Sequence, residues 1–371
     1  MRVPRPRLPV RDYEIGPLLD VLLISAVATI LVIRLQLWLT DYPQLGGGKL
    51  HIAHLLYGGF FMLAAIVIML SFLTRTSQHA AALLGGIGFG FFIDELGKFI
   101  TEDNDYFFQP TAAIIYLVFV VLFLSTRGLQ RRRGFTQREY LMNTIELLED
   151  AALHDLDERE RRRALSFLDR ADQSDPLVAP VRTLLEHIET IPAKQPSRPR
   201  RGAQTLEEAY LRLIEKRWFT RAMSIFFICY AAVSLVRILG LVLALGALAF
   251  GRDAFAVFQA FFNHVDDFSF ITWATIASSA ASAVLWVIGA VKLRTQGRAA
   301  AYQMFERGLL VSIFITQVFV FIRSSFSAVF GLGFNVALLV TLRFMMREEE
   351  RIKRGESKPG VRAKAAVRAR V

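Results

Sequence analysis

Cysteine is almost absent from this chain of 371 residues, because Cys229 is the only one. One thiol cannot form a disulfide within the chain, so cysteine usage indicates nothing about the redox compartment. The motifs of several enzyme classes are absent too, since the sequence has no nucleophile elbow, no Walker phosphate loop and no HExxH zinc motif. No complete catalytic set can therefore be recognised in the sequence.

Acidic residues are fewer than basic ones, with 33 Asp and Glu against 44 Lys and Arg, which gives a formal net charge of +11. The basic excess forms no patch interleaved with aromatic residues, so we expect no nucleic-acid partner. Basic residues instead flank apolar segments, where they set membrane topology and attract anionic headgroups. Membrane lipid is therefore the first partner that the composition predicts.

Long hydrophobic runs are what the sequence has in abundance, with 54% hydrophobic residues and 31 Phe. A hydrocarbon layer of about 30 Å is crossed by about 20 apolar residues in a helix. The chain offers about eight such blocks, near residues 17–38, 51–73, 80–99, 110–126, 222–249, 269–292, 304–322 and 325–342. The predicted fold class is an all-α polytopic membrane helical bundle of about eight transmembrane helices.

Charge around these blocks predicts their orientation, because short loops rich in Lys and Arg stay cytoplasmic. The arm before the first block carries Arg2, Arg5, Arg7 and Arg11, and the tail 347–371 is also basic. The first block is too long for a cleaved signal and has no small-residue cleavage site after it. We expect both termini to be cytoplasmic. Arginine greatly outnumbers lysine, which is typical of a GC-rich bacterial genome. We therefore also expect a bacterial inner membrane.

A charged segment divides the membrane part into two halves. The predicted domains are a first membrane half (1–126), a cytoplasmic helical insertion (127–221) with a Pro- and Arg-rich linker (192–203), a second membrane half (222–346) and a basic tail (347–371). Within the insertion, Thr136 with Glu139 and Asp157 with Glu160 have the spacing of capping boxes. The helices of residues 136–190 offer a surface for homo-oligomers or a cytoplasmic protein partner.

The two halves share a weak similarity. Ile93–Ile100 (IDELGKFI) lines up with Ile315–Ile322 (ITQVFVFI), so Asp94 and Glu95 correspond to Thr316 and Gln317. Because each half has an even number of helices, a duplication predicts parallel repeats in a four-plus-four arrangement. Apolar segments also align easily by composition, and this alternative stays open.

The stretch from Ala81 to Asp105 concentrates the unusual residues of the chain. Ala82, Gly86, Gly90, Asp94 and Lys98 recur every fourth residue and form one helical stripe. Small residues on such a stripe let a neighbouring helix approach closely in lipid. Ionisable residues within a membrane helix mark a functional site by default. We therefore expect a helix-packing stripe that ends in a buried charge site at Asp94, Glu95 and Lys98.

Two membrane arginines could neutralise these carboxylates. Arg34 and Arg237 lie at a depth similar to that of Asp94 when residues are counted along their helices at about 1.5 Å each. A membrane arginine without a partner is costly, so we predict pairing of Arg34 or Arg237 with Asp94 or Glu95. The alternative is a local pair between Asp94 and Lys98, four residues apart.

A metal site is a further hypothesis. His51 and His54 lie on one face of the second block, at the same outer side as Asp94 and Glu95. Imidazole and carboxylate together suit a divalent metal such as zinc, iron or manganese. Further acids and a histidine lie on that side at Glu102, Asp103, Asp105, His264, Asp266 and Asp267. In the alternative, the histidines are interfacial residues and the loop acids are solvated.

One segment resembles known sequences. Gly86–Pro110 (GIGFGFFIDELGKFITEDNDYFFQP) is similar to a block in uncharacterised multi-pass membrane proteins of high-GC bacteria, a resemblance that implies no activity. A looser similarity to VanZ-type small membrane proteins places His54, Glu95 and Asp105 at that family's histidine and acids. The Asn-Gly turn of the VanZ-type pattern is missing here.

Three functions follow as hypotheses. A transporter or permease would use the outer-half charges as a proton or cation site. A metal-dependent membrane enzyme acting on a lipid or envelope precursor would use the histidines and carboxylates to hold a metal that activates water. A scaffold or signalling protein would act through the insertion. We rank transport first because no complete catalytic set is visible.

Overall fold

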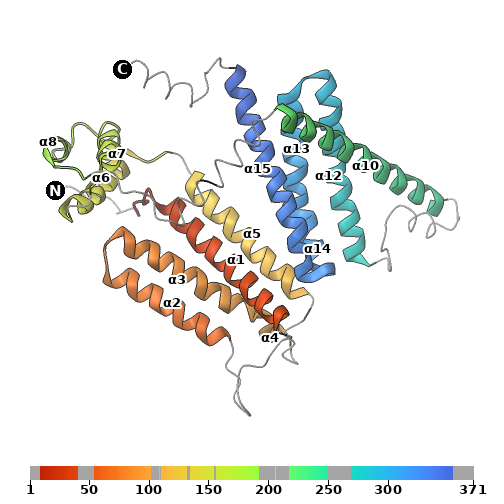
Figure 1. Cartoon of the computed structure of the whole chain (residues 1–371), viewed down its shortest axis with the longest axis horizontal. Coiled ribbons are helices and arrows are strands. Elements are labelled where there is room, and N and C mark those ends of the chain that lie inside the picture. The colour runs from red at the N-terminus through yellow and green to blue at the C-terminus, as the bar shows by residue number, and fades with distance from the viewer. Residues whose placement is uncertain are drawn as a thin grey trace, which may run out of the picture. The chain divides into compact units, whose positions relative to one another are not determined.

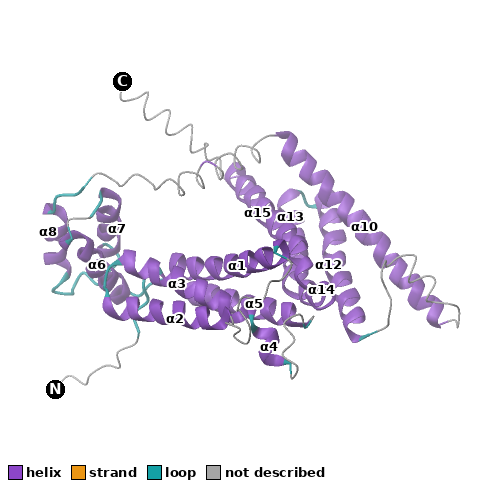
Figure 2. Cartoon of the chain, turned by 60° about the horizontal axis from the view of Figure 1, so that its bottom comes forward, coloured by secondary structure: helices purple, strands orange, loops and turns teal. Residues whose placement is uncertain are grey.

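The computed structural model describes residues 9–40, 54–101, 108, 110–131, 134–153, 156–191, 205, 217–249 and 269–353. Within these ranges the regular structure is helical, apart from an isolated bridge between Asp157 and Ile191, and Figure 2 shows the helices and the loops between them. The chain divides into two compact units, Met1–Phe108 with Val118–Ser197 and Gln109–Leu117 with Arg198–Val371. The all-helical fold class is thus confirmed for the described residues.

Five helical stretches of the described residues are long and apolar enough to cross a membrane. They are Ile15–Leu39, His54–Ser71, Pro110–Gly128, Phe270–Thr295 and Arg298–Arg347. The last stretch has 50 residues and contains a turn at Ser325–Ser327, so it comprises two of the apolar blocks. These helices indicate a membrane protein. The count of eight spans stays a prediction.

The first unit contains four helices that correspond to the first three apolar blocks. These are α1 (Ile15–Leu39), α2 (His54–Ser71), α3 (Arg75–Asp94) and the short α4 (Leu96–Ile100), drawn in red to orange in Figure 1. α3 packs along both α1 and α2. A fifth helix, α5 (Pro110–Arg131), belongs to the second unit up to Leu117 and to the first from Val118.

Glycine makes both contacts of α3 possible. A Cβ atom at Gly86 would lie 1.9 Å from Oγ of Ser25 and 2.3 Å from the Leu22 carbonyl oxygen, both in α1. On another face of α3, a Cβ atom at Gly88 would lie 2.7 Å from the backbone oxygen of Gly58 in α2. Such close backbone approach requires residues without side chains, as is common where helices pack in lipid.

The insertion folds into a small helical module that belongs to the first unit. Its helices are α6 (Gln137–Ala152), α7 (Glu158–Leu168) and α8 (Val178–His187). The capping boxes predicted at Thr136 with Glu139 and at Asp157 with Glu160 are both confirmed. Buried leucines from the three helices, among them Leu147, Leu168 and Leu185, form its core. The linker 192–203 and most of the helix predicted after it lie outside the described residues.

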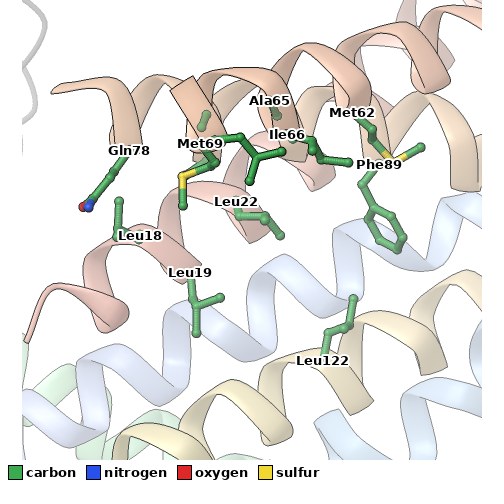
Figure 3. A pocket seen from close by; sticks show the side chains of 14 residues that line it. Leu18, Leu19, Leu22, Met62, Ala65, Ile66, Met69, Gln78, Phe89 and Leu122 are labelled. Atoms are coloured by element: carbon green, nitrogen blue, oxygen red, sulfur yellow. The ribbon is translucent and has the colours of Figure 1, made fainter. Parts of the chain in front are cut away.

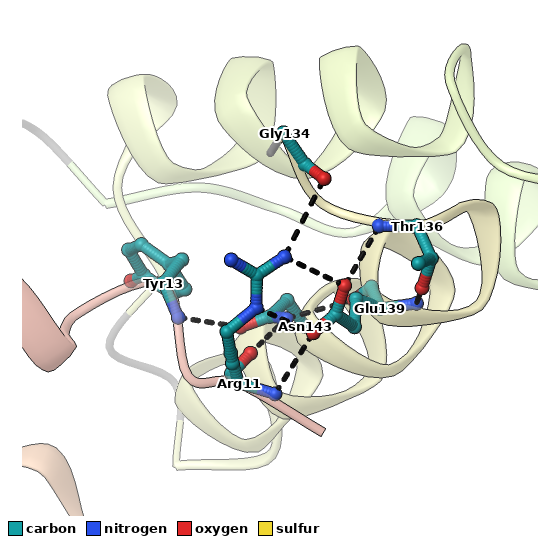
Figure 4. Close-up of polar contacts among 6 residues, drawn as sticks. All are labelled: Arg11, Tyr13, Gly134, Thr136, Glu139 and Asn143. Atoms are coloured by element: carbon teal, nitrogen blue, oxygen red, sulfur yellow. Dashed lines mark hydrogen bonds and ion pairs between the residues drawn. The ribbon is translucent and has the colours of Figure 1, made fainter. Parts of the chain in front are cut away.

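The chain just before α1 is bound to this module (Figure 4). Nε of Arg11 donates to Oε1 of Glu139 over 2.8 Å, and Nη2 donates to Oε2 over 3.0 Å. Asn143 binds the backbone of this N-terminal segment. Its Oδ1 accepts a hydrogen bond from the Tyr13 amide, and its Nδ2 donates one to the Arg11 carbonyl. The Tyr13 ring then lies under the guanidinium of Arg75, the first residue of α3. The module is thereby tied to the start of both α1 and α3.

The second unit is built around aromatic residues. Its helices are α10 (Arg217–Ala249), α12 (Phe270–Thr295), α13 (Arg298–Val311), the π-helical turn η1 (Ser312–Thr316), α14 (Gln317–Ser324), the 3-10 turn η2 (Ser325–Ser327) and α15 (Ala328–Lys353). Phe227, Trp286 and Phe305 are fully buried against one another, with ring centroids 5.2 to 5.6 Å apart. Nε2 of Gln317 donates to the Ala328 carbonyl across the turn between α14 and α15.

The helix interruptions bear on the predicted repeat. α3 ends at Asp94, and the aligned region of the second unit contains the π-helical turn η1, which ends at Thr316. The helix contacts differ, however, because α1 packs on α3 whereas α10 packs on α12. The repeat therefore stays a prediction, supported by where the helices are interrupted and not by how they pack.

Candidate functional site

The charged residues at the end of α3 lie at a break between two helices. α3 ends at Asp94, Glu95 is a turn residue, and α4 begins at Leu96. Both carboxylates are buried, with Asp94 0% and Glu95 1% exposed. Carboxylates at a helix C-terminus meet the negative end of the helix dipole, which disfavours their charge. Two buried anions at this place therefore need positive partners.

Arg34 of α1 provides the partner of Asp94. Its Nε donates to Oδ1 of Asp94 over 2.8 Å, and its Nη2 donates to the Asp94 backbone oxygen over 3.3 Å. The guanidinium thus binds both the carboxylate and the backbone carbonyl of the last residue of α3. A fork of donors suits this double role, which a lysine could not fill in the same geometry.

Glu95 has a different set of partners. Its Oε1 accepts from the backbone amide of His54 over 3.2 Å and lies 3.5 Å from Nδ1 of the same residue. His54 is the first residue of α2, so Glu95 places a negative charge at the positive end of that helix. The carboxylate therefore stabilises the start of α2 in the way that an anion at a helix N-terminus does.

The second oxygen of Glu95 is paired with Lys98. Nζ of Lys98 lies 2.7 Å from the buried Oε2, the distance of a charge-assisted contact between an ammonium and a carboxylate. Nδ1 of His54 is buried and makes no hydrogen bond to the described residues. The side chains of His54 and Glu95 are in contact. Glu95 and His54 thus form a pair of titratable groups beside Lys98.

The formal charges of the cluster balance when His54 is neutral, because Arg34 and Lys98 oppose Asp94 and Glu95. Balanced charge is what a low-dielectric environment requires of buried ions. Exposure differs within the cluster, since Asp94 and Glu95 are enclosed whereas the side chains of His54 and Lys98 are 19% and 24% exposed. His54 and Lys98 therefore connect the enclosed carboxylates to the surroundings.

The other predicted site residues are placed as follows. The stripe residues Gly86 and Gly90 lie against α1, where a Cβ atom at Gly90 would be 2.6 Å from the Ala26 carbonyl oxygen. Ala82 lines an apolar cavity. Arg237 lies in α10, but its side chain is outside the described set, and Arg34 is the arginine that reaches Asp94.

The predicted metal site is only partly described. His51 and all the loop acids and the loop histidine named above lie outside the described residues. Among the residues that are described, no three His, Cys, Asp or Glu side chains gather as a metal-binding group. His54 and Glu95 come together, but within the described ranges they lack a third ligand.

Two features of this region were not predicted from the sequence. The crossing of Gly58 with Gly88 lies outside the four-residue stripe, and only the glycine content of α2 could have signalled it. The role of Glu95 at the start of α2 depends on where two distant helix ends meet, which leaves no local signal.

No family model, no curated protein and no solved structure matches the chain. The functional argument therefore rests on this geometry.

Proposed function

We propose that this chain is a multi-pass protein of a bacterial inner membrane, with both termini cytoplasmic, and that it is a permease with a proton- or cation-linked site. The observation that carries this proposal is the Glu95 carboxylate, which is 1% exposed and contacts both the Lys98 ammonium and the His54 side chain. A buried acid within a membrane segment is suited to binding and releasing a proton or a small cation.

The two acids have separate tasks in this proposal. Asp94 is held by two contacts from Arg34 and keeps α1 and α3 together. Glu95 is the exchanging group, because its partners His54 and Lys98 are the more exposed members of the cluster. When Glu95 takes up a proton or a cation, its ion pair with Lys98 is weakened.

Binding of a proton or a cation at Glu95 would also affect α2, α3 and α4. The carboxylate binds the first amide of α2, and Glu95 itself lies between α3 and α4. Neutralising it weakens the interaction with the α2 dipole, so the start of α2 and the α3–α4 break become free to rearrange. Broken helices beside an ion site are a recurring feature of secondary transporters.

The proposal is tested with purified protein in vesicles that contain a pH-sensitive dye. A sodium or potassium gradient is imposed, and the internal pH is followed for the wild type, Glu95→Gln and Asp20→Asn. Asp20 is the matched control, because it is a 40% exposed carboxylate paired with Arg127. We expect a cation-dependent pH change that falls at least about tenfold in Glu95→Gln and stays unchanged in Asp20→Asn.

Two outcomes would overturn the proposal. One is a wild-type signal no larger than that of empty vesicles for either cation and for an imposed pH gradient alone. The other is a signal that Glu95→Gln leaves intact. In both cases the far-ultraviolet circular dichroism of the variants is compared with that of the wild type, so that unfolding does not account for the result.

A further inference from the structure

A cavity of about 540 Å³ lies at the other end of the α1–α2–α3 assembly (Figure 3). It is partly open and is lined by side chains from α1, α2 and α3 together with Leu122 of α5. Leu18, Leu22, Met62 and Met69 are among the residues that point toward it in Figure 3. Its volume is within the range of about 300 to 1,000 Å³ that is usual for ligand pockets.

The lining dictates what the cavity can hold. Except for Gln78, every residue that lines it is apolar. Water occupies a cavity only where several polar groups can bind it, so an apolar space of this size does not fill with water. Left empty, its lining would lose dispersion contacts over its whole surface. The helices around it include spans apolar enough for a bilayer, where the surrounding solvent is hydrocarbon.

Gln78 gives the cavity a polar end. It lies in the first turn of α3, and Figure 3 shows its amide at the edge of the group of lining side chains. Its Oε1 is buried and accepts no hydrogen bond. A buried amide oxygen without a donor is unfavourable, so the site favours an occupant that brings an N–H or O–H group to this end.

Charged residues of both signs lie close to lining residues in the sequence. Arg75 precedes Gln78 by three residues and lies 3.6 Å from Oε1 of Glu14. Asp20 follows Leu19 of the lining and pairs with Arg127 over 3.4 Å. An apolar cavity that ends in a hydrogen-bond acceptor matches the order of groups in a phospholipid, from chain to headgroup.

We propose that this cavity binds one acyl chain of a membrane phospholipid, and that Gln78 accepts a hydrogen bond from the headgroup. The headgroup must then carry a donor. The ammonium of phosphatidylethanolamine and the glycerol hydroxyls of phosphatidylglycerol do so, whereas the quaternary ammonium of phosphatidylcholine has no N–H. The site therefore prefers the first two lipids to phosphatidylcholine.

This lipid site is distinct from the charged cluster. Asp94 lies sixteen residues after Gln78 on α3, which corresponds to about 24 Å along the helix. Lipid binding needs none of the residues Arg34, His54 or Glu95. The two proposals can therefore fail independently.

The test uses the full chain in nanodiscs that contain a trace of phospholipid with a photoreactive group in its acyl chain. The labelled lipid is phosphatidylethanolamine, phosphatidylglycerol or phosphatidylcholine in separate samples, and labelled peptides are located by mass spectrometry. Gly85→Leu fills the cavity, since a Cβ atom at Gly85 would meet only Ala65 Cβ, at 3.5 Å. Leu83→Phe is the control, because Leu83 is 46% exposed and does not line the cavity.

We expect labelling at Met62 and Met69 to fall at least about fivefold in Gly85→Leu and to stay unchanged in Leu83→Phe. Gln78→Leu should keep the labelling but remove the preference for the two donor-bearing lipids over phosphatidylcholine. Labelling spread evenly over the exposed face of α2, with the same yield in Gly85→Leu, would overturn the proposal. Crosslinks from the cavity to a second copy of the chain in place of lipid would also overturn it. Because the labelled positions in the wild type are decisive alone, the test does not depend on the variants folding.

Discussion

Oε1 of Glu95 accepts the backbone amide of His54 over 3.2 Å and joins the α3–α4 break to the start of α2. Glu95 thus makes a structural contact with one oxygen and an ion pair with Lys98 through the other. This division allows one side chain to hold a helix end and to exchange a proton.

The pair of Arg34 and Asp94 should be coupled strongly. Arg34→Ala leaves the buried Asp94 carboxylate without its guanidinium, and breaking a buried ion pair in this way costs about 3 to 5 kcal/mol. The double variant Arg34→Ala with Asp94→Asn should recover a large part of this loss, because no unpaired charge remains. The measurement is the free energy of unfolding in detergent for the four members of the cycle.

An exposed pair provides the control for that cycle. Asp20 and Arg127 are 40% and 42% exposed, and such pairs contribute about 0 to 1 kcal/mol. Equal coupling energies for the exposed and the buried pair would contradict the role assigned to Arg34.

Neighbouring glycines of α2 should differ in their response to substitution by alanine. Gly58→Ala places a Cβ atom 2.8 Å from both the Gly88 oxygen and the Phe92 nitrogen, whereas a Cβ atom at Gly59 meets nothing within 4 Å. Forcing backbones apart costs about 1 to 3 kcal/mol, so Gly58→Ala should lower the free energy of unfolding by that amount. Gly59→Ala should stay within about 1 kcal/mol of the wild type, because alanine favours helix. Thermal unfolding in detergent distinguishes the two, and equal effects would argue against the close crossing.

Binding of the N-terminal arm to the insertion should depend on pH. The hydrogen bonds from Arg11 and from the Thr136 amide lower the pKa of Glu139 to about 2 from its ordinary value of 4.5. A lowered pKa stabilises the folded state above pH 4.5, and that stabilisation is lost as the pH falls toward 2. The protection factors of the amides of residues 11–13, which correct for the intrinsic pH dependence of hydrogen exchange, should therefore be high at pH 5 and fall as the pH approaches 2.

Other acids near this junction act in the opposite direction. Burial raises the pKa of both Glu14 and Glu146, so their protonation on acidification relieves an unfavourable charge. The contribution of Glu139 is obtained by comparison with Glu139→Gln, in which low protection factors at residues 11–13 are expected already at pH 5. An unchanged pH profile in Glu139→Gln would show that the arm is held by other contacts.

Part of this site could be predicted from the sequence because the cost of a charge in a membrane is local information. Asp94 and Arg34 each require a partner wherever they are placed, and counting residues gave similar depths for both. The four-residue spacing of Gly86 and Gly90 likewise indicated a close helix contact before its partner was known.

The rest depended on three-dimensional position. The spacing of four residues allows Lys98 to pair with Asp94, but the break at Glu95 brings the Lys98 ammonium to the Glu95 carboxylate, three residues earlier. The cavity beside Gln78 had no sequence signal either, because its lining consists of the same leucine, methionine and alanine residues that face lipid elsewhere.

The most direct measurement of the central claim is infrared difference spectroscopy of the reconstituted protein as the pH is stepped. Protonation of a buried carboxylate produces a carbonyl stretching band that can be assigned by substitution. We predict a component of the titrating carboxyl band that is lost in Glu95→Gln and retained in Asp94→Asn, since Asp94 is paired with Arg34. A difference spectrum that Glu95→Gln leaves unchanged while the protein stays folded would contradict a proton-exchanging role for Glu95.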